Sequence, residues 1–285
     1  MLFRSPGRVT LVATATDVDG NIGTATRDLK VRDLADQLPP SVSLAVPAPG
    51  AVIATAIDVT GTVTDSNLDE YVLEISRVGD DAWTTLARGT AAVAGQTLAR
   101  LDPANWSNGS YTLRLRATDM AGRQATTLRT VEIAGATKNA FTTSAVDMTA
   151  TLDGTAFDVR RISNSLEAAT PGTFGFGWLL AGAEPRITTN VPPPAPGAAV
   201  PAALTDTTRL TLTLPDGRRS AFTFAPVRQE RPGVVSFAPA WTDTESSGCR
   251  LDTPAAVLER VDTGYHLLGS GLPYNPPDAR LGGTA

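Results

Sequence analysis

Cysteine and histidine are almost missing from this chain of 285 residues, which contains one of each, Cys249 and His266. A single cysteine cannot form an intramolecular disulfide, and one cysteine with one histidine cannot supply the ligands of a structural zinc site. Any Ser-His-Asp or Cys-His mechanism would have to use His266, which lies in a predicted strand at 264–267. We therefore expect no cofactor, no metal and no catalytic residues, although sequence alone leaves paired glycosidase carboxylates open.

Clustered positive charge and long apolar runs are lacking as well. The net charge is −5 and no basic stripe occurs, which excludes nucleic acid as a partner because phosphate binding needs grouped Lys and Arg. No run of about 18 apolar residues is present, so no membrane span is expected. The segment 1–5 is too short for a signal peptide. It reads Met-Leu-Phe-Arg-Ser, which a sequencing adapter would encode, so we expect a foreign scar there, with a genuine start as the alternative.

An internal repeat organises the first half of the chain. The segment 9–20 realigns on 111–122, because both read as an alternating strand followed by Ala-Thr-Asp and a turn ending in Gly. Each copy is therefore a predicted hairpin. A repeat of about 100 residues that ends in such a hairpin is typical of an immunoglobulin-like β-sandwich. Residues 1–36 are then the truncated C-terminal hairpin of one such domain.

Residues 39–135 contain a complete second copy. Pro39-Pro40 marks the linker, alternating apolar residues predict strands, and Asn108-Gly109 predicts a turn. Tyr111 opens the penultimate strand, where a sandwich places a tyrosine corner. This span resembles the bacterial immunoglobulin-like and fibronectin-like modules of large surface proteins.

Three features of this half have alternative interpretations. The acidic run at 17–21 has calcium-loop spacing but lacks the distal Glu, so a plain hairpin turn is favoured. Asp65, Asp69 and Glu70 are expected in a solvated acidic loop. Trp83 and Trp106 could stack on sugars, but sandwiches commonly bury Trp, and we expect core positions.

The second half, 136–285, has a different pattern. A predicted strand and turn at 147–154 and a predicted strand at 157–165 precede a glycine-aromatic segment, and a Pro-rich run at 192–201 interrupts the remainder of this half. The glycines allow close backbone approach or positive φ while the aromatic rings pack on one side. The motif residues of this half are Gly172, Phe174, Gly175, Gly177, Trp178, Asp216, Gly217 and Arg218.

These motifs resemble the region that precedes the YD repeats in Rhs and related toxin-complex proteins. The resemblance implies that the segment 172–178 opens the β-structure of a hollow shell, and that the turn 216–218 leads into an aromatic strand at 222–224. The chain itself contains no Tyr-Asp repeat, autoprotease or toxin domain. Shell formation, self-cleavage and toxicity are therefore not carried over to these residues.

The predicted fold is all-β: an immunoglobulin-like sandwich followed by an irregular β-rich segment leading into a YD-repeat shell. The predicted function is a non-catalytic scaffold of a large secreted or surface bacterial protein. Its expected partners are the downstream shell of the same polypeptide and the surface of a host or neighbouring cell. The alternatives are an adhesin or carbohydrate-binding module, and an accessory region of a polysaccharide-degrading enzyme. An isolated segment 136–285 is expected to aggregate or to be partly disordered, because its strand edges would be exposed.

Overall fold

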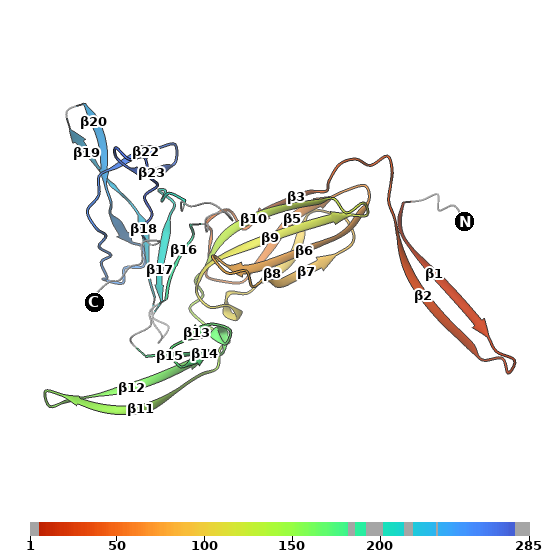
Figure 1. The fold of residues 1–285 in the computed structure, drawn as a ribbon, viewed down its shortest axis with the longest axis horizontal. Helices are drawn as coiled ribbons and strands as arrows, with labels where there is room; N and C mark the ends of the chain where they lie inside the picture. Colours follow the sequence, from red (N-terminus) through yellow and green to blue (C-terminus); the bar gives the residue numbers. More distant parts are fainter. Residues whose placement is uncertain (1–5, 182–185, 192–201, 214–218, 232, 277–285) are drawn as a thin grey trace.

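The regular structure of the computed structural model is almost entirely β-strand, and the model describes residues 6–181, 186–191, 202–213, 219–231 and 233–276. Strands account for 59% and helices for 3% of it, so the predicted all-β class is confirmed. Two hairpins project from the body of the molecule, one near the N-terminus and one in the middle of the chain (Figure 1). Among the residues that the structure describes, no helix is long and apolar enough to cross a membrane.

The N-terminal hairpin consists of β1 (Gly7–Thr16) and β2 (Ile22–Val31), paired antiparallel from end to end. Asp17 closes its turn by accepting hydrogen bonds from the backbone N–H groups of Asp19 and Asn21. Gly20 has a φ of +86°, a conformation that glycine adopts without steric cost. The acidic run at 17–21 therefore forms a hairpin turn, the interpretation that the sequence favoured over a calcium loop.

The same hairpin recurs in the centre of the chain as β9 (Gly109–Asp119) and β10 (Gln124–Ile133). Asp119 binds the backbone N–H groups of Ala121 and Arg123 as Asp17 binds its own turn. All ten cross-strand pairs of β1–β2 reappear 102 residues later, as with Val9 opposite Leu29 and Tyr111 opposite Val131. The predicted repeat is thus present in the backbone as well as in the sequence.

Two sheets enclose the core of the central region. The larger sheet has the order β4 (Val52–Ile53), β10, β9, β6 (Leu68–Arg77) and β7 (Thr84–Gly89). The smaller sheet has the order β3 (Ser41–Val46), β5 (Ile57–Thr64) and β8 (Val93–Leu101). A short 3₁₀ turn, η1 (Pro103–Asn105), precedes β9. Residues from both sheets form one buried cluster, because alternate side chains of each strand point into the space between the sheets.

The start of β6 corrects one expectation. The segment around Asp65 and Glu70 was expected to be a solvated loop, but Asn67 is 4% and Asp69 3% exposed. Asn67 donates its backbone N–H to Asp65, and Asp69 lies within the strand. Burial of Asp69 is tolerated because Arg8 and Lys30 pair with its carboxylate.

The second projecting hairpin consists of β11 (Thr142–Leu152) and β12 (Thr155–Asn164), and β15 (Trp178–Leu180) pairs with the end of β12. Between them lie η2 (Ser165–Glu167) and the two-residue strands β13 (Pro171–Gly172) and β14 (Gly175–Phe176). Met148, Leu152 and Phe157 remain largely exposed on this hairpin. Within the described residues, β11 has a partner strand on only one side.

Two four-stranded sheets complete the described chain. One has the order β16 (Arg186–Thr189), β17 (Arg209–Thr213), β18 (Arg219–Phe224) and β21 (Trp241–Asp243). The other has the order β19 (Val227–Arg231), β20 (Val234–Ala238), β22 (Leu258–Val261) and β23 (Gly264–Leu267). Phe224 makes ring contacts with Trp241, Tyr265 and Tyr274, and it is 1% exposed. This region therefore has a buried aromatic core of its own.

Candidate functional site

Glu132 joins the central sheets to the sheet formed by β16, β17, β18 and β21. This residue of β10 is 2% exposed, and its Oε2 atom lies 2.5 Å from Nε of Arg209 in β17. Thr211 donates its hydroxyl to Oε1 at 3.1 Å, and the guanidinium of Arg219 also pairs with Oε1. A carboxylate buried to this degree is tolerated only when it is paired and hydrogen-bonded. Four side chains from three strands are thus held together at this junction.

A second set of contacts lies beside this junction. Arg77 of β6 binds Glu167 of η2 at 2.7 Å, and both side chains are mostly buried. Lys138 donates to the carbonyl of Pro103 at 2.8 Å. Burial, together with the nearby positive charge of Arg219, lowers the pKa of Lys138 to about 8. The chain after residue 136 is therefore bound to the central sheets at several points.

Asp69 makes the corresponding junction to the N-terminal hairpin. Its carboxylate accepts from Arg8 at 2.5 Å and also pairs with Lys30, and these two residues face each other across β1 and β2. Lys30 occupies the repeat position of Glu132, 102 residues earlier. In both copies, then, the end of the second hairpin strand carries an ion pair to the next unit, with the charges reversed.

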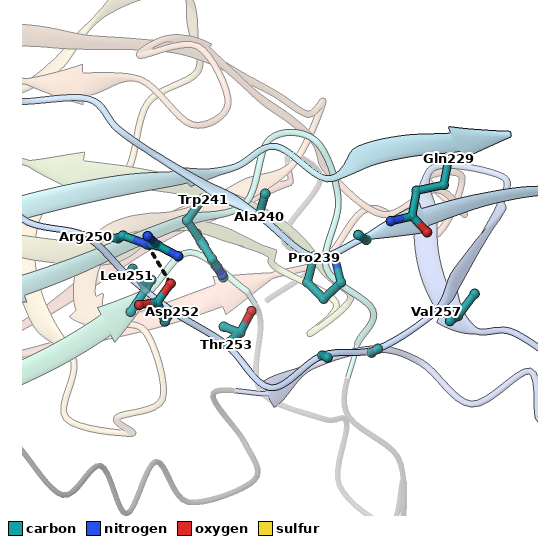
Figure 2. A pocket seen from close by; sticks show the side chains of 12 residues that line it. Gln229, Pro239, Ala240, Trp241, Arg250, Leu251, Asp252, Thr253 and Val257 are labelled. Carbon is teal, nitrogen blue, oxygen red and sulfur yellow. Dashed lines mark hydrogen bonds and ion pairs between the residues drawn. The ribbon is translucent and has the colours of Figure 1, made fainter.

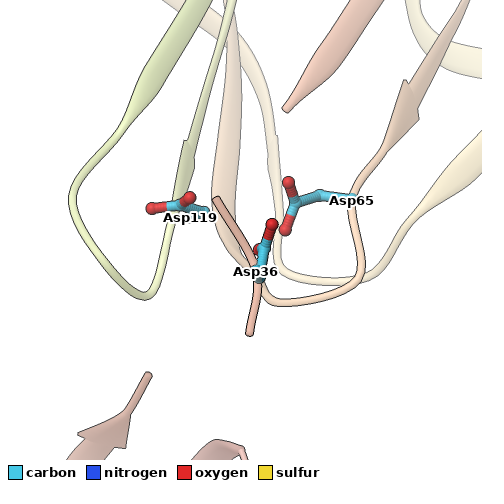
Figure 3. Close-up of side chains that lie close together, drawn as sticks. All are labelled: Asp36, Asp65 and Asp119. Atoms are coloured by element: carbon cyan, nitrogen blue, oxygen red, sulfur yellow. The ribbon is translucent and has the colours of Figure 1, made fainter. Parts of the chain in front are cut away.

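Three carboxylates converge where the linker meets the central sheets. Asp36, Asp65 and Asp119 each place an oxygen within 4.8 Å of the other two (Figure 3). Among the residues that the structure describes, this is the one group with the geometry to hold a metal ion. The positive charge at this place comes from Arg123, whose Nε lies 2.6 Å from Asp119 and whose Nη2 lies 3.2 Å from Asp36. The cluster thus fixes the linker residue Asp36 to the turn after β9.

The carboxylates of this cluster differ in their titration. Burial raises the pKa of Asp65, and the charges of Asp36 and Asp119 raise it further against the opposing hydrogen bond from Asn67. Burial acts in the same direction on Asp119, but hydrogen bonds from Arg123 and Ala121 outweigh it and lower the pKa of Asp119. Arg123 therefore compensates Asp119 well and leaves Asp65 as the carboxylate with excess negative charge around it.

Asp65→Asn should raise the free energy of unfolding at pH 7 by about 0.5–1 kcal/mol, because the neutral amide avoids the burial of a charged carboxylate and its repulsion by Asp36 and Asp119. The folded state binds the Asp65 proton more tightly than the unfolded state, so the charged form is disfavoured above the raised pKa. The gain should vanish as the pH falls below the unfolded value of 3.8, where both states are protonated. Urea unfolding of both proteins across this pH range measures it.

The matched control is Asp58→Asn, because Asp58 is half exposed and its one ion pair among the described residues is with exposed Arg100 at 3.4 Å. This variant should not gain stability. A loss of stability in Asp65→Asn at pH 7 would contradict the assigned electrostatics of the cluster.

Tyr111 makes the hydrogen bond expected of a tyrosine corner. Its hydroxyl donates to the carbonyl of Ser107 at 3.0 Å, and the ring is 2% exposed. Trp106 packs edge-on against this ring with centroids 5.9 Å apart. The side chain thus ties the loop before β9 to the core.

Tyr111→Phe should lower the free energy of unfolding by about 1–3 kcal/mol, because it leaves the Ser107 carbonyl without this partner in a buried place. Tyr71→Phe is the control, since Tyr71 belongs to the same core but has no hydroxyl hydrogen bond within the described parts of the chain. Denaturant unfolding should separate the two variants by at least about 0.5 kcal/mol, the net contribution of one hydrogen bond. Equal effects would show that the hydroxyl of Tyr111 does not contribute.

The glycine-aromatic segment forms a tight turn. Gly172 approaches the chain so closely that a Cβ atom there would lie 2.2 Å from the carbonyl oxygen of Trp178. Gly175 and Gly177 have φ of +100° and +73°, which also favour glycine. The glycine prediction was therefore sound.

The expected packing of the aromatic rings on one side is wrong for two of them. Phe174 is 40% and Phe176 71% exposed. Trp178 is partly buried, and Arg161 lies over its ring at 5.1 Å from the centroid. The predicted turn at Asp216, Gly217 and Arg218 lies outside the described residues.

A pocket in the C-terminal sheets has a volume of about 710 Å³. It lies between Pro239–Trp241 and the extended segment 250–257 (Figure 2). Arg250 and Asp252 form an exposed ion pair of 2.7 Å at its edge. Its lining includes neither His266 nor Cys249.

The tryptophans named as a possible sugar platform both have protein contacts. Trp83 is partly buried, and the guanidinium of Arg114 lies 3.7 Å from its ring centroid. Trp106 packs against the central core. Each indole ring therefore has at least part of its surface covered by the protein, so the two rings do not form an open platform for sugars.

No family model matches this chain, and no curated protein matches it.

Proposed function

We propose that this chain is a non-catalytic structural scaffold within a large secreted or surface bacterial protein. In this proposal residues 39–135 act as an immunoglobulin-like spacer, and residues 136–285 lead into a YD-repeat shell. The observation that carries it is the use of buried charge: Glu132 and Asp69 bind cations of the neighbouring units instead of facing a cavity. Charges used in this way fix the relative placement of units.

Several observations support the spacer part. Two sheets of unequal size share one core, as in aligned sandwiches, and Tyr111 makes a corner-type hydrogen bond. Both ends of the central sheets carry ion pairs to the adjoining segments. A rigid spacer needs such fixed ends, since inter-domain motion is the default without a large or well-paired interface.

The binding-module alternative has less support. A sugar-binding face usually presents an aromatic ring to solvent, but Arg114 covers one face of Trp83. The fold itself does not decide between spacer and adhesin, because sandwiches serve both roles. Tryptophan fluorescence that is quenched by simple sugars, and that Trp83→Ala abolishes, would favour the adhesin.

The shell part is tested by the coding sequence downstream of residue 285. Recurrent Tyr-Asp motifs with spaced Gly-Arg would support the proposal. A run of further sandwich repeats or a catalytic domain in their place would contradict it. The spacer part is tested by small-angle X-ray scattering of the whole chain. A profile that requires independently moving units would contradict a rigid spacer.

A further inference from the structure

We propose that one face of the β1–β2 hairpin is a docking surface for a β-rich unit built like residues 39–108. This unit would close a second two-sheet core over the face that carries Val9, Leu11 and Leu29. The inference rests on the two-sheet arrangement of the central region and is independent of the proposed shell.

The internal repeat identifies what covers the face. Because β1–β2 and β9–β10 have the same register, each residue of the first hairpin has a defined counterpart. Leu11 is 38% exposed, whereas its counterpart Leu113 is fully buried by the central sheets. Val31 and Ile133 show the same contrast, since Ile133 is fully buried and Val31 is not. In the second copy the cover is supplied by β3, β5 and β8, which belong to residues 39–108.

An arginine in the middle of this face points to the same kind of cover. Arg129 pairs with Leu113 across the second hairpin and donates its Nη2 to the carbonyl of Leu44 in β3 at 2.6 Å. Arg27 occupies the equivalent position opposite Leu11 and is exposed. An arginine on a core-facing side is satisfied when a backbone carbonyl of the opposing sheet reaches it. The docked unit should therefore present a carbonyl like that of Leu44.

The free edge of β1 sets the register of docking. In the second copy β9 lies between β10 and β6, with Ile75 opposite Leu113. In the described residues β1 has β2 as its one partner strand, so its other edge has unpaired backbone groups. A strand equivalent to β6 would pair antiparallel with this edge and place its Ile75 counterpart opposite Leu11.

The side chains of the face also restrict the partner. Val9 and Ala13 stand where the second copy has the larger Tyr111 and Leu115. A copy of residues 39–108 would therefore leave cavities, which are destabilising in proportion to their volume. The natural partner should carry bulkier apolar residues at the facing positions. This difference also argues against a second copy of the present chain as the occupant.

The test is a fusion in which a second copy of residues 39–108 precedes Gly7 of the otherwise complete chain. Asn108 of the added copy is then followed by Gly7, as Asn108 is by Gly109 in the natural chain. Val9→Tyr and Ala13→Leu are included in a second version to fill the expected cavities. Hydrogen exchange of the β1 and β2 backbone amides should slow by roughly 100-fold or more relative to the unmodified chain, as for amides that move from a fraying element into a core.

Two adjacent substitutions provide matched controls. In the fusion, Leu11→Asp should abolish the added protection, because it places a charge in the new core. Val12→Asp should leave it unchanged, since Val12 points to the opposite face, as its counterpart Arg114 does. In the unmodified chain neither substitution should alter the unfolding of the central region.

Other outcomes would overturn the inference. The amides of β9 and β10 act as an internal reference for the two-sheet arrangement. If they are protected while β1 and β2 stay unprotected in both fusions, the docking proposal is wrong and the central spacer stands. If neither hairpin is protected, the spacer itself is wrong. A dimer of the unmodified chain that Leu11→Asp dissociates in sedimentation would identify a second copy as the occupant.

Discussion

Glu132→Ala should lower the free energy of unfolding by about 3 kcal/mol, the lower end of the range for breaking a buried ion pair. The substitution leaves Arg209 without its carboxylate partner in a place where its side chain is only 21% exposed. Arg219 retains Glu245 at 2.9 Å, which limits the loss. Because the pair joins β10 to β17 and β18, unfolding of the central sheets and of the sheet that contains β17 should also become separable in denaturant.

The control for this prediction is Glu230→Gln. Glu230 pairs with Arg228 at 3.3 Å, and both side chains are more than half exposed, so its loss should cost less than about 0.5 kcal/mol. A joint replacement of Glu132, Arg209 and Arg219 by apolar residues of similar size should restore much of the stability, since it leaves no unpaired charge. Equal costs for Glu132→Ala and Glu230→Gln would contradict the buried junction.

Phe224→Ala should lower the free energy of unfolding of the C-terminal sheets by about 3–5 kcal/mol. The ring is 1% exposed and contacts the rings of Trp241, Tyr265 and Tyr274, so its removal leaves a cavity among rigid aromatic side chains. Tryptophan fluorescence reports this unfolding directly, because Trp241 is one of the contacts. The expected loss is large enough to unfold this region at ambient temperature if its stability is at the low end for a domain.

Phe176→Ala is the matched control, because Phe176 is 71% exposed and its truncation should cost less than about 0.5 kcal/mol. Similar small effects of both substitutions would mean that residues 202–276 lack a cooperative core. That result would support the expectation that the isolated segment 136–285 aggregates or is partly disordered, which stays a prediction.

The fold class and the hairpins could be predicted from local sequence patterns. Alternation of apolar residues, the Asp-to-Gly turns and the repeat can be read from the sequence, and they predicted the hairpins β1–β2 and β9–β10. Glycine requirements were also readable, as Gly172 and Gly177 show. These signals need no knowledge of tertiary contacts.

The burial of charged side chains could not be predicted in the same way, because it depends on partners that are distant in the sequence. Asp69 looked like a solvated acid because its partners Arg8 and Lys30 lie 61 and 39 residues away. Glu132 was not singled out, since Arg209 and Arg219 lie 77 and 87 residues further along. No local signal was available, because Glu132 lies between Val131 and Ile133 as the polar residue of an ordinary alternating strand does. The exposure of Phe176 likewise depends on which strands cover it.

The reversed charges at Lys30 and Glu132 have a consequence for how such chains can be rearranged. The hairpin base with Lys30 accepts a following unit that presents an acid like Asp69, whereas the base with Glu132 accepts one that presents two arginines. If the two following units were exchanged, Lys30 would face arginines at one junction and Glu132 would face an aspartate at the other, so like charges would meet at both. Recombination between the copies would therefore yield a stable product only when each hairpin is transferred together with the unit that follows it. The charge at each hairpin base thus matches one following unit and repels the other, which fixes the order of the units.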